Sequence, residues 1–118
     1  MRTIPADINA DLHCHSIVSD GTLTPEALAC RAHTNGVRLW SLTDHDEVGG
    51  QERAKIAAED IGMQYIPGVE ISVTWSSKTV HIVGLGIDYK NTNLIEGLHH
   101  TRNGRSNRAL EIAEQLAK

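Results

Sequence analysis

The chain has 118 residues, of which 40% are hydrophobic, and this length is enough for one small domain with a modest core. Its formal net charge is −4, whereas general nucleic-acid-binding proteins have an excess of basic residues. No apolar run approaches the roughly 20 residues of a membrane-spanning helix. Cys14 and Cys30 form no disulfide or zinc pattern and are expected to be core thiols, so a cytoplasmic protein without a membrane partner is predicted.

The first half of the chain alternates between strand and helix signals. A short strand is predicted at 8–13. Thr24 is then expected to cap a helix that has Pro25 at its first position and ends before Gly36. The apolar stretch at 37–43 predicts a second strand.

A second helix is expected at about 50–61, because its alanines fall on one face. An extended segment at 65–75, a turn at 76–78 and a returning strand at 79–88 follow. A last helix is predicted at about 105–118. Strands and helices in this order predict an α/β fold with parallel strands, in which catalytic side chains gather where the strands end.

Two histidines flank Cys14 at the end of the first predicted strand, in the sequence Asp11-Leu12-His13-Cys14-His15. Side chains two residues apart on a strand share a face. His13 and His15 are therefore expected to present two imidazoles to one ion, while Cys14 points the other way. A lone histidine is usually a core or surface residue, whereas a pair at a strand end also indicates a metal site.

Four further residues occupy similar places. Asp20 lies in the loop after the first strand, and His45 directly follows the second strand. Glu70 and His81 are polar residues inside otherwise apolar extended segments, where a carboxylate is costly unless it is paired or metal-bound. Each has an alternative: Asp20 as a turn residue, His45 as a helix cap, and Glu70 with His81 as a hydrogen-bonded pair. A metal cluster accounts for all of them together.

The predicted metal ligands are therefore six in number: His13, His15, Asp20, His45, Glu70 and His81. Imidazole and carboxylate ligands together suit Mn, Zn or Fe. Six ligands exceed what one tetrahedral ion needs, and a carboxylate such as Glu70 could bridge two ions. Clusters of this sort promote phosphoester hydrolysis. Asp44 and Asp46 are predicted to orient His45 from behind.

Two arginines stand near the start of the last predicted helix. Arg105 falls on its apolar side, and Arg102 would join it if the helix began earlier. An arginine at a helix N-terminus is well placed to bind a phosphate. The alternative is that both precede the helix or extend into solvent.

The segments DLHCHS, SDGTLTPE, LTDHDEVGG, GVEIS and HIVGLGID resemble, in order, the motifs of the PHP (polymerase and histidinol phosphatase) family over nearly the whole chain. The resemblance is strongest to nucleoside 3',5'-bisphosphate phosphatases and 5'-3' exoribonucleases, where Arg105 matches a phosphate-binding arginine. It implies that residues 1–118 are the N-terminal portion of a distorted (β/α)7 barrel. An inserted helical region is expected to start within 100–118.

The resemblance also implies two or three divalent ions. The first ion is expected at His13, His15 and Glu70. Glu70 is expected to bridge to a second ion at His81. The third ion is expected at Asp20 and His45. Full-length relatives add ligands from a C-terminal half, so the 118-residue chain is expected to be inactive alone. The open edge of a part-barrel predicts a homo-oligomer, a domain swap or a missing C-terminal half.

The function implied is hydrolysis of a phosphate monoester in a nucleoside 3',5'-bisphosphate, or release of 5' nucleotides from RNA. The partner is then a small nucleotide or a short RNA 5' end. Two alternatives are kept: a histidinol-phosphate phosphatase, which the arginine-bearing segment makes less favoured, and a non-catalytic module that binds metal or nucleotide.

Overall fold

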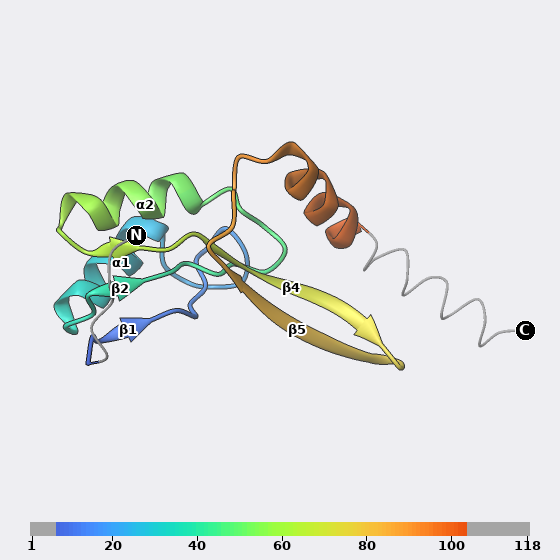
Figure 1. Cartoon of the computed structure of the whole chain (residues 1–118), viewed down its shortest axis with the longest axis horizontal. Coiled ribbons are helices and arrows are strands. Elements are labelled where there is room, and N and C mark those ends of the chain that lie inside the picture. Colours follow the sequence, from blue (N-terminus) through green and yellow to red (C-terminus); the bar gives the residue numbers. More distant parts are fainter. Residues whose placement is uncertain (1–6, 104–118) are drawn as a thin grey trace, which may run out of the picture.

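The structure, a computed structural model, describes residues 7–103. A parallel sheet has the order β1-β2-β3, with bounds β1 (Ala10–Asp11), β2 (Leu39–Trp40) and β3 (Gln64–Tyr65). Helices α1 (Pro25–Thr34) and α2 (Gln51–Asp60) connect these strands and lie side by side (Figure 1). The predicted alternation of strands and helices, with parallel strands, is confirmed over this part.

A long antiparallel hairpin projects from this unit (Figure 1). Its strands are β4 (Gly68–Trp75) and β5 (Lys78–Leu85). Ser76 and Ser77 form the two-residue turn, with φ values of 50° and 65° that match the twist of a tight hairpin. The extended segment expected at 65–75 is divided between β3 and β4, because the chain leaves the parallel sheet at Pro67, which has no N–H to donate.

Helix α1 begins at its predicted cap, and a glycine follows each of the two labelled helices. The Thr24 hydroxyl accepts the Ala27 N–H at 3.1 Å, and Pro25 occupies the first turn of α1. Gly36 and Gly62 follow the two helices with φ values of 87° and 79°, which glycine adopts readily. The alanines of both helices pack with Trp40 in the main core, whose buried members are Ala29, Ala32, Val37, Trp40, Leu42, Ala54, Ala58 and Met63.

A further helix at 92–103 was not predicted (Figure 1). The Asn91 side chain accepts the Leu94 N–H at 3.1 Å and so caps its first turn. Leu98 from this helix joins Val48 and Val69 in a second, smaller core at the base of the hairpin. The helix predicted at 105–118 lies outside the described residues.

The outer strand of the hairpin exposes large apolar side chains. Val80, Ile82, Val83 and Leu85 are each 39–52% exposed, and in the part of the chain described here β5 pairs only with β4. An exposed apolar edge of this kind favours pairing with further polypeptide. No helix within residues 7–103 is both long enough and apolar enough to cross a bilayer.

Candidate metal centre

The site forms where the parallel sheet meets the hairpin. An isolated parallel bridge joins His45, just past β2, to Glu70 in β4. The Glu70 N–H donates to the Asp44 carbonyl at 3.0 Å, and the Asp46 N–H donates to the Glu70 carbonyl at 2.9 Å. The ends of the strands therefore meet at one edge, as the sequence predicts for an α/β fold.

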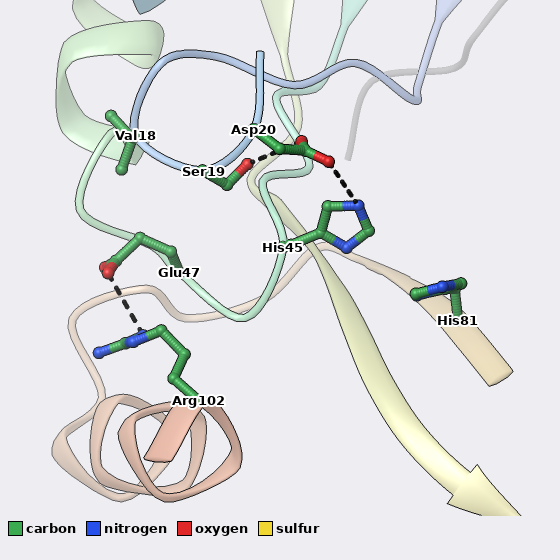
Figure 2. A pocket seen from close by; sticks show the side chains of 7 residues that line it. All are labelled: Val18, Ser19, Asp20, His45, Glu47, His81 and Arg102. Carbon is green, nitrogen blue, oxygen red and sulfur yellow. Dashed lines mark hydrogen bonds and ion pairs between the residues drawn. The ribbon is translucent and has the colours of Figure 1, made fainter. Parts of the chain in front are cut away.

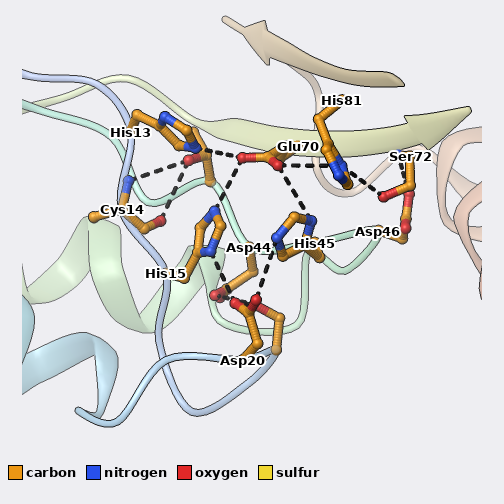
Figure 3. A network of polar contacts seen from close by, with 12 residues as sticks. His13, Cys14, His15, Asp20, Asp44, His45, Asp46, Glu70, Ser72 and His81 are labelled. Atoms are coloured by element: carbon orange, nitrogen blue, oxygen red, sulfur yellow. Dashed lines mark hydrogen bonds and ion pairs between the residues drawn. The ribbon is translucent and has the colours of Figure 1, made fainter. Parts of the chain in front are cut away.

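Four imidazoles surround the Glu70 carboxylate (Figure 3). Its Oε1 contacts Nε2 of His13 and lies 3.1 Å from Nε2 of His15. Its Oε2 lies 3.3 Å from Nδ1 of His45 and 3.4 Å from Nδ1 of His81. The two oxygens thus face different pairs of histidines, which is the arrangement that a carboxylate bridging two cations requires.

Asp20 closes the opposite side of the cluster. Its Oδ1 lies 2.8 Å from Nδ1 of His15, and its Oδ2 lies 3.3 Å from Nε2 of His45. Each of these two imidazoles therefore stands between Asp20 and Glu70, with one nitrogen toward each (Figure 3). The structure brings all six predicted ligand residues together.

The six residues form three overlapping triads whose ligand atoms lie within 4.8 Å of one another: His13, His15 and Glu70; His15, Asp20 and His45; His45, Glu70 and His81. A neutral imidazole offers one lone pair and one N–H. His15 and His45, which each belong to two triads, can therefore bind a cation through one nitrogen and donate a hydrogen bond through the other.

The local chemistry fits divalent cations. The Glu70 side chain is only 5% exposed, and its ion-pair partners among residues 7–103 are all histidines. The buried Nδ1 of His45 lies close to Glu70 but makes no hydrogen bond of good geometry with any described residue. A cation would satisfy both groups, since buried carboxylates and imidazoles need a partner.

The imidazoles also act on the acidity of both carboxylates. Desolvation raises the pKa of Glu70, but the hydrogen bonds from His13 and His15 and the charge of His45 outweigh it, so the pKa lies below its ordinary value. Desolvation likewise raises the pKa of Asp20, and His15 and His45 bring it below its ordinary value. Both carboxylates are therefore anionic at neutral pH.

Asp44 fixes the loop that carries Asp20. Its buried carboxylate accepts the N–H of Ser16 at 2.6 Å, the hydroxyl of Ser16 at 2.8 Å and the hydroxyl of Ser19 at 2.8 Å. The same loop closes tightly on itself at Gly21, where a Cβ atom would lie 2.1 Å from the His15 carbonyl oxygen. The position of Asp20 relative to His15 thus depends on this loop.

Asp46 and Ser72 support the other side of the site. The Asp46 carboxylate accepts the Ser72 N–H at 2.9 Å, which anchors β4 two residues beyond Glu70. The Ser72 hydroxyl lies 3.1 Å from Nδ1 of His81 across the hairpin. Ser72 was not predicted, because a serine in a strand carries no signal until its cross-strand partner is known. The role of Asp44 and Asp46 in orienting His45 stays a prediction.

The two cysteines lie apart from the cluster. Cys14 points away from Glu70 as predicted, and its Sγ accepts the indole N–H of Trp40 at 3.2 Å. Burial raises the pKa of its thiol to about 12, so it is an unreactive packing group. Cys30 is exposed, so the expectation that it is a core thiol is wrong.

A pocket of about 500 Å³ opens beside the cluster, and Arg102 lines it together with Asp20, His45 and His81 (Figure 2). Arg102 belongs to the helix at 92–103, so it sits within a helix rather than at the start of one. Its guanidinium contacts the Asp46 carbonyl and lies 3.3 Å from Glu47. Arg105, the other predicted phosphate-binding residue, lies outside the described residues.

Known proteins resemble the chain in sequence and in fold. The family model of the PHP domain matches residues 11–117. A 3',5'-nucleoside bisphosphate phosphatase from Chromobacterium violaceum is 47% identical, and a 5'-3' exoribonuclease from Haemophilus influenzae is 44% identical, each over 92% of this chain. The chain spans only 38% and 39% of the length of these two relatives.

Two solved structures share the fold. A Chromobacterium violaceum amidohydrolase with bound sulfate superposes with a TM-score of 0.80 at 47% identity, over 92% of this chain and 38% of that one. A Bifidobacterium adolescentis protein assigned to the metal-dependent phosphoesterases gives a TM-score of 0.78 at 32% identity, over 97% of this chain and 40% of that one. The predicted fold class is thereby confirmed.

Proposed function

Since this chain belongs to the PHP domain family, we propose that the protein which contains it is a metal-dependent phosphoesterase. The observation that carries this proposal is the convergence of four imidazoles and two carboxylates on three overlapping triads. The six predicted residues are proposed as the metal ligands, with Glu70 shared by two ions.

The ions would supply Lewis-acid activation of a water and of the phosphoester. The residues of the chain supply the rest. Glu70, nearly buried between two pairs of histidines, would hold an ion through each of its two oxygens. Asp20, whose side chain is 61% exposed, faces the pocket where a substrate would enter. Two or three ions of Mn, Zn or Fe are proposed, because mixed imidazole and carboxylate ligands suit these metals.

The substrate that we propose is a small nucleotide, specifically a nucleoside 3',5'-bisphosphate, or the 5' end of a short RNA. Two relatives that are 47% and 44% identical to this chain carry the names of a bisphosphate phosphatase and an exoribonuclease. Arg102 at the pocket rim supports an anionic substrate, and Arg105 stays a proposed phosphate ligand. A cytoplasmic location is proposed as well, since nucleotides and RNA are cytoplasmic substrates.

One observation favours a second function, metal binding without catalysis, for the 118-residue chain on its own. Each triad offers three protein ligands, and the side chains of His13 and Asp20 are 60% and 61% exposed. A site this open can hold an ion without the enclosure that catalysis needs. We therefore infer that the isolated chain binds metal but turns over slowly or not at all.

The substrate proposal is tested with adenosine 3',5'-bisphosphate and the protein at its full natural length. Phosphate release is expected with Mn²⁺ and is expected to stop when a chelator removes the metal. Histidinol phosphate and a 5'-phosphorylated RNA oligonucleotide serve as comparison substrates. Faster release of phosphate from histidinol phosphate would refute the nucleotide assignment. Bound metal without turnover of any phosphoester would mean that the protein is a non-catalytic binding module.

We further infer that additional polypeptide covers the apolar side chains of β5, either from a second copy through association or domain swapping, or from a C-terminal half. Val80 and Ile82 exemplify this face, at 39% and 52% exposed. The 118-residue chain is expected to self-associate in size-exclusion chromatography, whereas the protein at its full length is expected to do so less. A stable, well-folded monomer of the short chain would contradict this.

A further inference from the structure

Glu47 lies two residues beyond His45, and its two carboxylate oxygens contact different parts of the fold. Its Oε1 accepts the N–H groups of Val48 and Gly49, at 3.1 and 2.9 Å, so it is held in place by its own loop. Its Oε2 lies 3.3 Å from Nη1 of Arg102, in the helix at 92–103 (Figure 2). One side chain therefore connects the loop after His45 to that helix.

Arg102 is held mainly through one of its terminal nitrogens. Nη1 faces both the Asp46 carbonyl and Glu47, and Nη2 lies 3.4 Å from Nδ1 of His99. A guanidinium has five N–H donors, and among residues 7–103 no acceptor is seen for Nε or for the second hydrogen of Nη2. The side chain is 31% exposed and lines the same pocket as His45. Two N–H groups in the plane of a guanidinium match the geometry of a phosphate.

We propose that Glu47 is a positioning residue that holds Arg102 at the rim of the pocket, ready to receive a phosphate group of the substrate. This inference rests on the proposed phosphoesterase function. A long arginine side chain loses rotamer freedom when it binds an anion. Because Glu47 is itself fixed by Val48 and Gly49, the ion pair removes much of that freedom beforehand.

The Glu47→Gln variant tests this role, because its amide oxygen can still accept the Val48 and Gly49 N–H groups while the negative charge is lost. Binding of inorganic phosphate to the Mn²⁺-loaded full-length protein is measured by calorimetry, beside KM and kcat for the phosphoester. Phosphate affinity is expected to fall about fivefold and KM to rise by the same factor, with kcat unchanged, as suits a partly exposed ion pair.

Two matched variants complete the test. Glu26→Gln removes the carboxylate of another Glu–Arg pair, in which N–H groups of Arg53 donate at 2.8 and 2.6 Å on the exposed surface. This variant is expected to change neither the phosphate affinity nor KM. In an Arg102→Ala background, Glu47→Gln is expected to have no further effect.

Several results would overturn the role of Glu47. Tighter phosphate binding by Glu47→Gln would mean that the carboxylate competes with the substrate for Arg102. Unchanged binding, a loss confined to kcat, or an effect that persists without Arg102 would each exclude positioning. Absence of hydrolysis of any phosphoester would refute the proposed function separately, while the phosphate titrations still decide the role of Glu47. A wild-type protein that binds no phosphate would refute the inference outright.

Discussion

Glu70→Gln is expected to lower the rate of metal-dependent phosphoester hydrolysis by more than about 100-fold, since loss of a group that merely supports a ligand already costs about 10- to 100-fold. Glu70 belongs to two of the three triads, and its two oxygens face different pairs of histidines. The amide has the same shape but no charge, so it is a poor ligand for two cations at once.

The measurement is metal content after dialysis, together with kcat/KM at saturating Mn²⁺, for the protein at its full length. The Glu70→Gln protein is expected to lose at least one ion relative to wild type. Glu26→Gln changes an exposed glutamate that lies outside the three triads and pairs with Arg53, so it serves as the control and is expected to keep the metal content and the kcat/KM of wild type. A Glu70→Gln protein with full metal content and activity would show that Glu70 is not the shared ligand.

Asp44→Ala is expected to be the most destabilising single change near the site, at about 3–5 kcal/mol. The Asp44 carboxylate is fully buried and accepts three hydrogen bonds from Ser16 and Ser19. Its removal leaves the buried N–H and hydroxyl of Ser16 without an acceptor. The loop that carries Asp20 then loses its anchor, so metal affinity at the triad of Asp20 is expected to fall as well.

Urea unfolding of the metal-free protein, followed by circular dichroism, measures this effect without a contribution from bound ions. Asp60→Ala is the matched control, because Asp60 is exposed at the end of α2 and its loss is expected to change stability by less than about 0.5 kcal/mol. Equal unfolding midpoints for the two variants would show that the Asp44 network does not stabilise the fold.

Local signals predict the parts of the fold that depend on neighbours in sequence. Thr24, Pro25 and Gly36 bound α1 because capping and glycine conformations act within one turn. The paired strands are shorter than predicted. Residues 41–43 are buried but belong to no strand, and they contact the segment of the first strand through single hydrogen bonds such as Ser41 N–H to the Asp11 carbonyl at 3.0 Å. Strand ends are set by partners elsewhere in the chain, which the sequence of one segment does not reveal.

The helix at 92–103 shows where local signals were present but weak. Asn91 is a good cap, and Leu94 and Leu98 have helical spacing. Gly97 and the two following histidines lower the helix propensity of the same stretch. Packing of Leu98 against Val69 at the base of the hairpin stabilises this helix despite its low intrinsic propensity.

Glu70 and His81 could be predicted because each is a polar residue in an otherwise apolar segment. The other candidate ligands could be predicted because they follow expected strands and because their motifs appear in the order of a known family. Glu47 and Ser72 could not be predicted in this way. Their roles depend on Arg102 and His81, which reach them only through the packing of the last described helix and the register of the hairpin.

We propose that four imidazoles and two carboxylates share divalent cations around Glu70. A crystal structure of the full-length protein grown with Mn²⁺, with anomalous scattering to locate the ions, shows whether they do. We expect at least two anomalous peaks, one on each side of the Glu70 carboxylate, within coordination distance of His13 with His15 and of His45 with His81. Fully ordered side chains with no anomalous peak at Glu70, or peaks only elsewhere in the molecule, would contradict the claim.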